Sequence, residues 1–143
     1  MSSSSVLNRQ ALASTPTAGR TWRIGLTSVS IALAANLAVY ALALLAGAEM
    51  TAGAMSINGF LVAANTVVPL LIATLLLLPL RRWGPRGWRV LATIGLALGL
   101  LSAPAPFTVA SEGSTRFALA FMHVVTGVVW FVVVRRAATR TGA

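Results

Sequence analysis

Long apolar runs separated by short polar stretches dominate the chain. Four such runs cover residues 24–47, 59–80, 88–108 and 117–134. A helix needs about 20 residues to cross a bilayer core of about 30 Å, so each run predicts one transmembrane helix. None of the runs alternates apolar and polar positions over about ten residues, as the strands of a membrane barrel do. The pattern therefore predicts an all-α, polytopic membrane protein, built as a bundle of four transmembrane helices.

The third run is the least regular of the four, because its last third contains Pro104 and Pro106. Proline has no backbone N–H to donate, and its ring clashes with the preceding helical turn. We therefore expect the regular helix to end near Ala103. A coil or short turn should follow it at the outer boundary of the membrane.

The arginines predict the orientation of the chain. Ten of the eleven arginines precede the first run, lie between the second and third runs, or follow the fourth run. Only Arg116 lies in the other two loops. Because arginine-rich loops stay in the cytoplasm, both termini are predicted to be cytoplasmic. Trp22, Trp83 and Trp88 would then lie at the cytoplasmic boundary, where aromatic side chains gather.

Composition agrees with a membrane setting. Hydrophobic residues make up 57% of the chain and charged residues 9%, whereas a soluble domain carries about 25% charged residues. The net charge of +9 does not indicate nucleic acid, because the arginines flank apolar runs instead of forming one basic face. The absence of cysteine excludes disulfides, thiolate metal sites and cysteine nucleophiles.

The two ends of the chain are expected to be cytoplasmic tails. Residues 1–21 are rich in Ser, Thr and Ala and predict a disordered tail. The transmembrane domain would then span residues 22–136, and a second tail residues 137–143. The end of the first run overlaps "AGA" at 46–48, a form typical of signal-peptide cleavage sites. Its apolar run exceeds the 7 to 15 residues of a signal peptide, so we expect a retained helix.

Polar side chains inside the apolar runs are candidate site residues, because they are costly in lipid. At about 1.5 Å per residue, Tyr40, Asn65 and His123 each lie roughly 9–10 Å from the outer end of their run. They therefore share one layer in the outer half of the membrane. Arg116 would stand about two turns above His123, at the outer mouth. The polar residues that we single out within the runs are Asn36, Tyr40, Asn65, Thr66, His123 and Thr126.

Two roles stay open for this layer. Asn36, Tyr40, Asn65 and His123 can hydrogen-bond across the bundle and fix the helix register of a structural or accessory protein. Alternatively, they line a small polar pocket of a transporter or sensor, in which His123 exchanges protons or contacts a ligand. In both cases His123 should point into the bundle, near Asn65 or Tyr40. A cavity that reaches His123 would favour the second role, and tight packing around it the first.

Motifs for catalysis are missing from the sequence. No nucleophile motif, phosphate-binding loop or dinucleotide motif occurs, so we expect a protein that is not an enzyme and has no cofactor. A single histidine without cysteine or acidic neighbours makes a poor metal site. The expected partners are the lipid bilayer and a second copy or another membrane protein. "GLALG" at 95–99 is a GxxxG pattern, which brings helices together either within one chain or between copies.

Two stretches carry a resemblance to a known family. "AANLAVYALALLAGAEM" in the first hairpin and "ALAFMHVVTGVV" in the last run resemble an actinobacterial family of four-helix membrane proteins of unknown function. The similarity covers about residues 22–136 and rests on Asn36, Tyr40, Pro69 and the Met122–His123 pair. The resemblance implies a multi-pass protein of a bacterial plasma membrane. It implies no activity.

Overall fold

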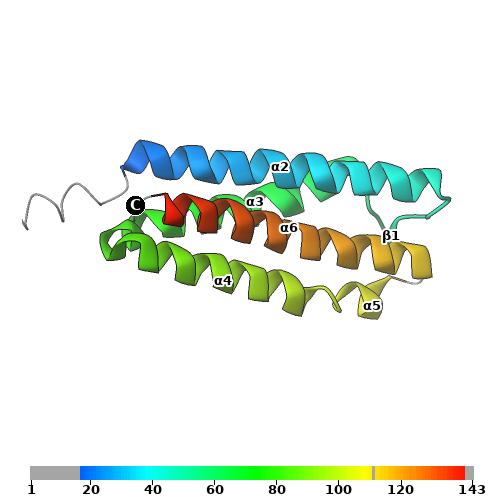
Figure 1. Ribbon diagram of the computed structural model, residues 1–143. Coiled ribbons are helices and arrows are strands. Elements are labelled where there is room, and N and C mark those ends of the chain that lie inside the picture. The colour runs from blue at the N-terminus through cyan, green and yellow to red at the C-terminus, as the bar shows by residue number, and fades with distance from the viewer. Residues whose placement is uncertain (1–16, 111, 141–143) are drawn as a thin grey trace, which may run out of the picture.

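The computed structural model describes residues 17–110 and 112–140, and most of these residues are helical. Figure 1 shows the long helices side by side, with the β-hairpin and a single-turn helix at one end. The long helices are α2 (Ala18–Leu45), α3 (Gly59–Leu80), α4 (Gly84–Ser102) and α6 (Gly113–Thr139). The short elements are the strands β1 (Thr51–Ala52) and β2 (Met55–Ser56), the 3-10 turn η1 (Arg81–Trp83) and the single-turn helix α5 (Pro106–Val109).

Helix α2 begins earlier than its apolar run. The Thr17 side chain accepts a hydrogen bond of 3.3 Å from the backbone N–H of Arg20, which caps the first turn. The helix therefore starts at Ala18 and includes polar residues before residue 24. Residues 1–16 of the predicted disordered tail lie outside the described residues. From Ala18 to Thr21 the prediction of disorder is wrong, because these residues are helical.

The chain reverses between α3 and α4 in a tight turn. Gly84 has φ +61°, a backbone conformation that favours glycine. Pro85 follows in the first turn of α4, where its missing N–H is not needed. This turn, the start of α2 and the end of α6 lie at the same end of the molecule (Figure 1). The Arg20 side chain donates to the carbonyl oxygen of Ala137 over 3.4 Å, linking two of these segments.

Regular helix ends at Ser102 in α4, which confirms the prediction made from the two prolines. The N–H of Ala105 bonds to the carbonyl of Ser102, and the N–H of Phe107 bonds to that of Pro104. These bonds span three residues and are typical of tight turns at helix ends. Helix α5 adds one turn before the chain enters α6.

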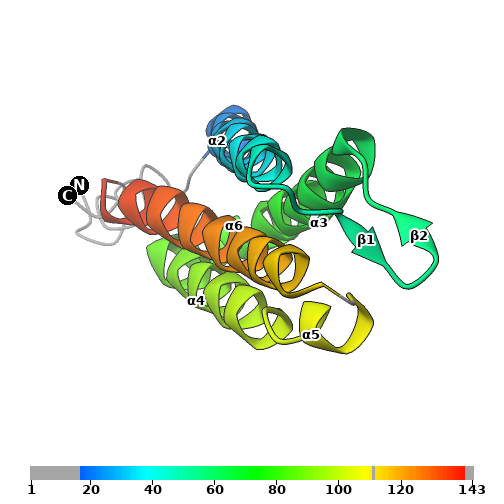
Figure 2. The same cartoon turned by 90° about the vertical axis from the view of Figure 1, so that its right-hand side faces the viewer.

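Helix α6 is the centre of the packing. It packs against both α2 and α4, whereas α2 packs against α3 (Figure 2). Small residues set the closest contact, because a Cβ at Gly99 would lie 2.8 Å from the Cα of Gly127. A Cβ at Gly95 would collide with the Trp130 ring, whose N–H donates to the carbonyl of Leu91 over 3.2 Å. The GxxxG pattern therefore serves contacts within this chain.

The interior has two groups of buried apolar side chains. The larger group surrounds Trp88, Trp130 and Leu77, and the smaller one includes Met50 and Met122 at the other end. Trp88 is fully buried, so its predicted place in an aromatic belt is wrong, whereas Trp22 and Trp83 are exposed.

The outer surface of the helices is strongly apolar. Large side chains such as Leu42, Leu45 and Leu101 are exposed. Three stretches of the described chain are long and apolar enough to cross a membrane, namely Ala18–Leu45, Gly59–Val109 and Gly113–Thr139. The protein is therefore all-α, with helices suited to a membrane.

Candidate functional site: a cavity between α3 and α4

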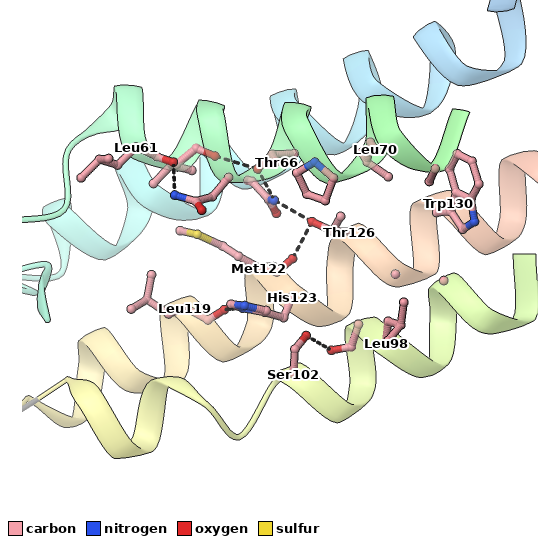
Figure 3. Close-up of a pocket in the computed structure, with 18 of the residues that line it drawn as sticks. Leu61, Thr66, Leu70, Leu98, Ser102, Leu119, Met122, His123, Thr126 and Trp130 are labelled. Atoms are coloured by element: carbon pink, nitrogen blue, oxygen red, sulfur yellow. Dashed lines mark hydrogen bonds between the residues drawn. The ribbon is translucent and has the colours of Figure 1, made fainter. Parts of the chain in front are cut away.

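Helices α3 and α4 follow one another in the chain, yet a cavity separates them. Its volume is about 590 Å³, within the range of small-molecule sites. Figure 3 shows labelled side chains of α3, α4 and α6 around this space. The cavity is open to the surface of the molecule, since Leu98 lines it and is 62% exposed. Its polar lining residues are Asn36, Asn65, Thr66, Ser102, His123 and Thr126.

Asn36 joins three helices at one edge of the cavity. Its side chain is 2% exposed. The amide nitrogen donates to the hydroxyl oxygens of Thr66 on α3 and Thr126 on α6, over 2.9 and 2.8 Å. Both hydroxyls donate in turn to carbonyls of their own helices, at Val62 and Met122. The amide oxygen Oδ1 is buried and has no hydrogen-bond partner.

The expected hydrogen bonds among Tyr40, Asn65 and His123 do not form. The Asn65 amide donates to the carbonyl of Leu61 over 2.9 Å, and the Tyr40 hydroxyl to that of Ile57 over 3.3 Å. For Asn65, the carbonyl of Leu61 four residues earlier in the same helix is within reach of the short side chain, and it competes with partners on other helices. The bridge between helices is formed by Asn36 and the two threonines instead.

His123 lines the cavity and is half-buried, so it faces the space between the helices as predicted. It shares the cavity with Asn65, whereas Tyr40 does not line it. The ring nitrogen Nδ1 lies 2.8 Å from the carbonyl oxygen of Leu119. A carbonyl can only accept, so Nδ1 carries the proton of this bond. In the neutral ring, Nε2 is then a hydrogen-bond acceptor.

Arg116 does not reach the cavity. Its Nε donates to the carbonyl of Ala110 over 2.7 Å and ties the start of α6 to the end of α5. Of the predicted site residues, the structure thus brings together Asn36, Asn65 and His123, and leaves Tyr40 and Arg116 outside.

Several residues of the cavity were not among the predicted candidates. Thr66 and Thr126 were recognised as polar but not chosen, although Thr126 follows His123 by three residues and so shares its face. Ser102 was missed because it lies next to the predicted helix end. The GxxxG pattern indicated a close helix contact at Gly99, and Gly127 is a small residue of the last run, a type that also marks helix contacts.

A second polar cluster lies around Glu112, just before the start of α6. Its carboxylate accepts from the Glu49 backbone N–H and the Thr115 hydroxyl, both over 2.8 Å, and from the Ser114 hydroxyl. The Ser114 hydroxyl, followed by the Glu49 N–H and the Thr115 hydroxyl, lowers the pKa of Glu112 below its ordinary value of 4.5. Thr115 also accepts from the N–H of Met50 over 3.1 Å. The cluster fastens the loop after α2 to the start of α6.

The polar groups of the cavity are suited to hydrogen bonding. Among residues 17–110 and 112–140, no three His, Asp or Glu side chains lie close enough to hold a metal ion. No Asp, Glu, Lys or Arg lines the cavity in this part of the chain. The arrangement can therefore recognise a ligand by its shape and by a few neutral hydrogen bonds.

Comparison with known proteins gives one match. A family described as "Family of unknown function (DUF6069)" matches residues 16–140. No curated protein and no solved structure matches the chain. The match and the sequence resemblance agree on one point: both assign the chain to a family of unknown function.

Proposed function

Because the chain belongs to this family of unknown function, we propose a role from its own geometry: a non-enzymatic membrane protein that binds a small apolar molecule from the bilayer, as a transporter or sensor does. The observation that carries the proposal is the cavity of about 590 Å³ lined by His123. A cavity at this place was the feature expected of a binding protein, in contrast to the tight packing of a purely structural one.

The proposed topology has four spans, with both termini in the cytoplasm of a bacterial cell. Helices α3 and α4 have 22 and 19 residues, which correspond to about 33 and 28 Å, enough for one crossing each. The stretch Gly59–Val109 has 51 residues and reverses at η1 and Gly84. Two spans joined by an arginine-rich turn fit it better than one.

The position of the cavity supports binding from within the membrane. Its walls belong mainly to the apolar helices α3, α4 and α6, and Leu98 on α4 is one of its exposed lining residues. A molecule dissolved in the bilayer would reach this opening without crossing water. An aqueous substrate would instead need a polar path from the outer end, where the β1–β2 hairpin contributes Ala52, Met55 and Ile57 to the lining.

The lining also supports a role without catalysis. Among the described lining residues, His123 is the one side chain of a type that commonly serves as a general base. The hydroxyls of Thr66, Ser102 and Thr126 each donate to a backbone carbonyl, so none of them is activated by a base. A nucleophile paired with a general base is therefore missing from the described lining.

Purification from native membrane, followed by mass spectrometry of bound small molecules, tests the proposal. Leu98→Trp fills the opening of the cavity, whereas Leu101→Trp adds the same ring on the same helix at a 77% exposed position outside the lining. We expect wild type and Leu101→Trp to retain an apolar molecule that Leu98→Trp loses. The same bound molecules in all three proteins would argue for a structural or accessory role.

A further inference from the structure

The cavity has hydrogen-bond acceptors in excess. Each hydroxyl of the lining has its single hydrogen bonded to a backbone carbonyl. The Asn36 amide nitrogen uses both hydrogens on threonines, and the Trp130 N–H uses its one on Leu91. Among the polar lining residues that the structure describes, only the exposed Asn65 keeps a spare amide hydrogen, since it makes one bond to Leu61.

Besides the side-chain oxygen of the exposed Asn65, three acceptors on the described lining residues lack a donor. Asn36 Oδ1 is buried without a partner. Nε2 of His123 is an acceptor because Nδ1 holds the proton in the bond to Leu119. Pro69 has no N–H, so the backbone carbonyl of Asn65, four residues earlier in α3, lacks its normal helical donor. All three residues and Pro69 line the same cavity.

The orientation of the Asn36 amide supports this assignment. With oxygen and nitrogen exchanged, Thr66 and Thr126 would have to give up their bonds to Val62 and Met122 in order to donate to the amide oxygen. Two amide hydrogens would then have no partner in place of one oxygen. A buried polar group without a partner is costly, so the orientation with Oδ1 free is favoured.

We propose that the ligand is a neutral lipid that carries a hydroxyl group, which donates to Asn36 Oδ1 while the chain of the lipid fills the cavity. The inference rests on the proposed function, because it assumes that the cavity binds a molecule. A hydroxyl supplies the donor that the lining lacks. A charged head group has no counter-charge, since no acidic or basic side chain lines the cavity in the described chain. The volume of about 590 Å³ holds roughly 20 water-sized groups, the size of one long-chain alcohol.

The test compares oleyl alcohol with its methyl ether on the full-length protein in phosphatidylglycerol nanodiscs. The two probes share one chain, but only the alcohol can donate a hydrogen bond. Saturable binding is measured with radiolabelled alcohol, against empty nanodiscs, and the ether is added as competitor. We expect the alcohol to bind about tenfold more tightly than the ether, equivalent to about 1.4 kcal/mol. Oleate and oleylammonium should compete at least tenfold more weakly than the alcohol.

Variants separate this inference from the proposed function. Asn36→Leu should abolish the preference for the alcohol, and Leu98→Trp should abolish binding of both probes, whereas Leu101→Trp should change neither. If neither probe binds to wild type, or if Leu98→Trp leaves binding intact, the cavity is not a binding site and both proposals fail. If alcohol and ether bind equally, or if Asn36→Leu keeps the preference because only water meets Oδ1, the inference alone is overturned. The comparison of the two probes on wild type needs no variant to fold.

Discussion

Gly99 on α4 lies directly against Gly127 on α6, and a Cβ added at Gly99 would stand 2.8 Å from the Gly127 Cα and 2.9 Å from the carbonyl oxygen of His123. Both of these atoms belong to the backbone, so no rotation of a side chain relieves the contact. The glycine pair thus fixes the distance between the two helices and sets one wall of the cavity.

Gly99→Ala should destabilise the protein by about 1–3 kcal/mol, the usual cost of adding a methyl group to a packed interior. Thermal unfolding in mild detergent measures the effect. Gly19→Ala is the matched control, because nothing lies within 4 Å of a Cβ at that position. Equal melting temperatures for the two variants would contradict the close contact between α4 and α6.

The orientation of the chain can be tested by labelling single cysteines in intact cells. A cysteine at Gly84, in the turn between α3 and α4, should resist a membrane-impermeant thiol reagent, because the arginine-rich turn is expected in the cytoplasm. Cysteines at Thr51 and Ser114 should react from outside. The native chain has no cysteine, so it serves as the unlabelled control. Labelling at Gly84 in sealed cells would refute the proposed topology.

His123→Leu should change the free energy of unfolding by less than about 0.5 kcal/mol, in the range of substitutions that disturb no special feature. The imidazole bonds only to the carbonyl of Leu119 on its own helix, so its removal strands no group on another helix. Thr126→Val is the informative comparison, because it removes an acceptor of the buried Asn36 amide and should cost about 1 kcal/mol. Chemical or thermal unfolding of both variants checks that Thr126→Val is more destabilising than His123→Leu. A larger cost for His123→Leu would assign His123 a structural role.

The cluster around Glu112 predicts a dependence of stability on pH. The pKa of Glu112 is lowered in the folded protein, so the carboxylate stabilises the fold above its ordinary pKa of 4.5. This contribution is lost as the pH falls through the lowered folded pKa. Glu112→Gln should therefore melt at a lower temperature than wild type at neutral pH, and the difference should shrink in acid.

Glu49→Gln provides the control for that experiment, since it removes the same charge from the neighbouring loop. Glu49 contributes its backbone N–H to the cluster, which the substitution leaves in place. A difference between Glu112→Gln and wild type that stays constant from neutral pH to well below 4.5 would show that ionisation of Glu112 is not the cause.

Hydropathy predicted the helices better than their ends. The bounds of α3 agree with residues 59–80, because Asn58 caps its start and arginines follow its end. Helix α2 begins before its apolar run, and α6 extends beyond its run at both ends, since backbone hydrogen bonds continue into polar sequence where a cap such as Thr17 allows it. An apolar run thus marks the part of a helix suited to lipid and not the whole helix.

The sequence indicated some residues of the candidate site but not how each helix is rotated about its axis. Counting residues placed Asn65 and His123 in one layer, and both line the cavity. Which polar groups meet across helices depends on the rotation of each helix about its axis and on bonds within the helix, and the sequence showed neither. The separation of α3 from α4 could not be predicted either. It follows from the contact of Gly95 and Gly99 with α6, which holds α4 away from its neighbour in the chain.

The order in which the helices are synthesised gives the central place of α6 a further meaning. Of the four long helices described, α6 is synthesised after the other three, and it supplies the surface on which both α2 and α4 pack. Until it arrives, the glycine face of α4 and the Asn36 amide hydrogen that Thr126 accepts have no partner on another helix. A chain without α6 would therefore present these groups to lipid, so the three earlier long helices are expected to be less stable on their own than together with α6.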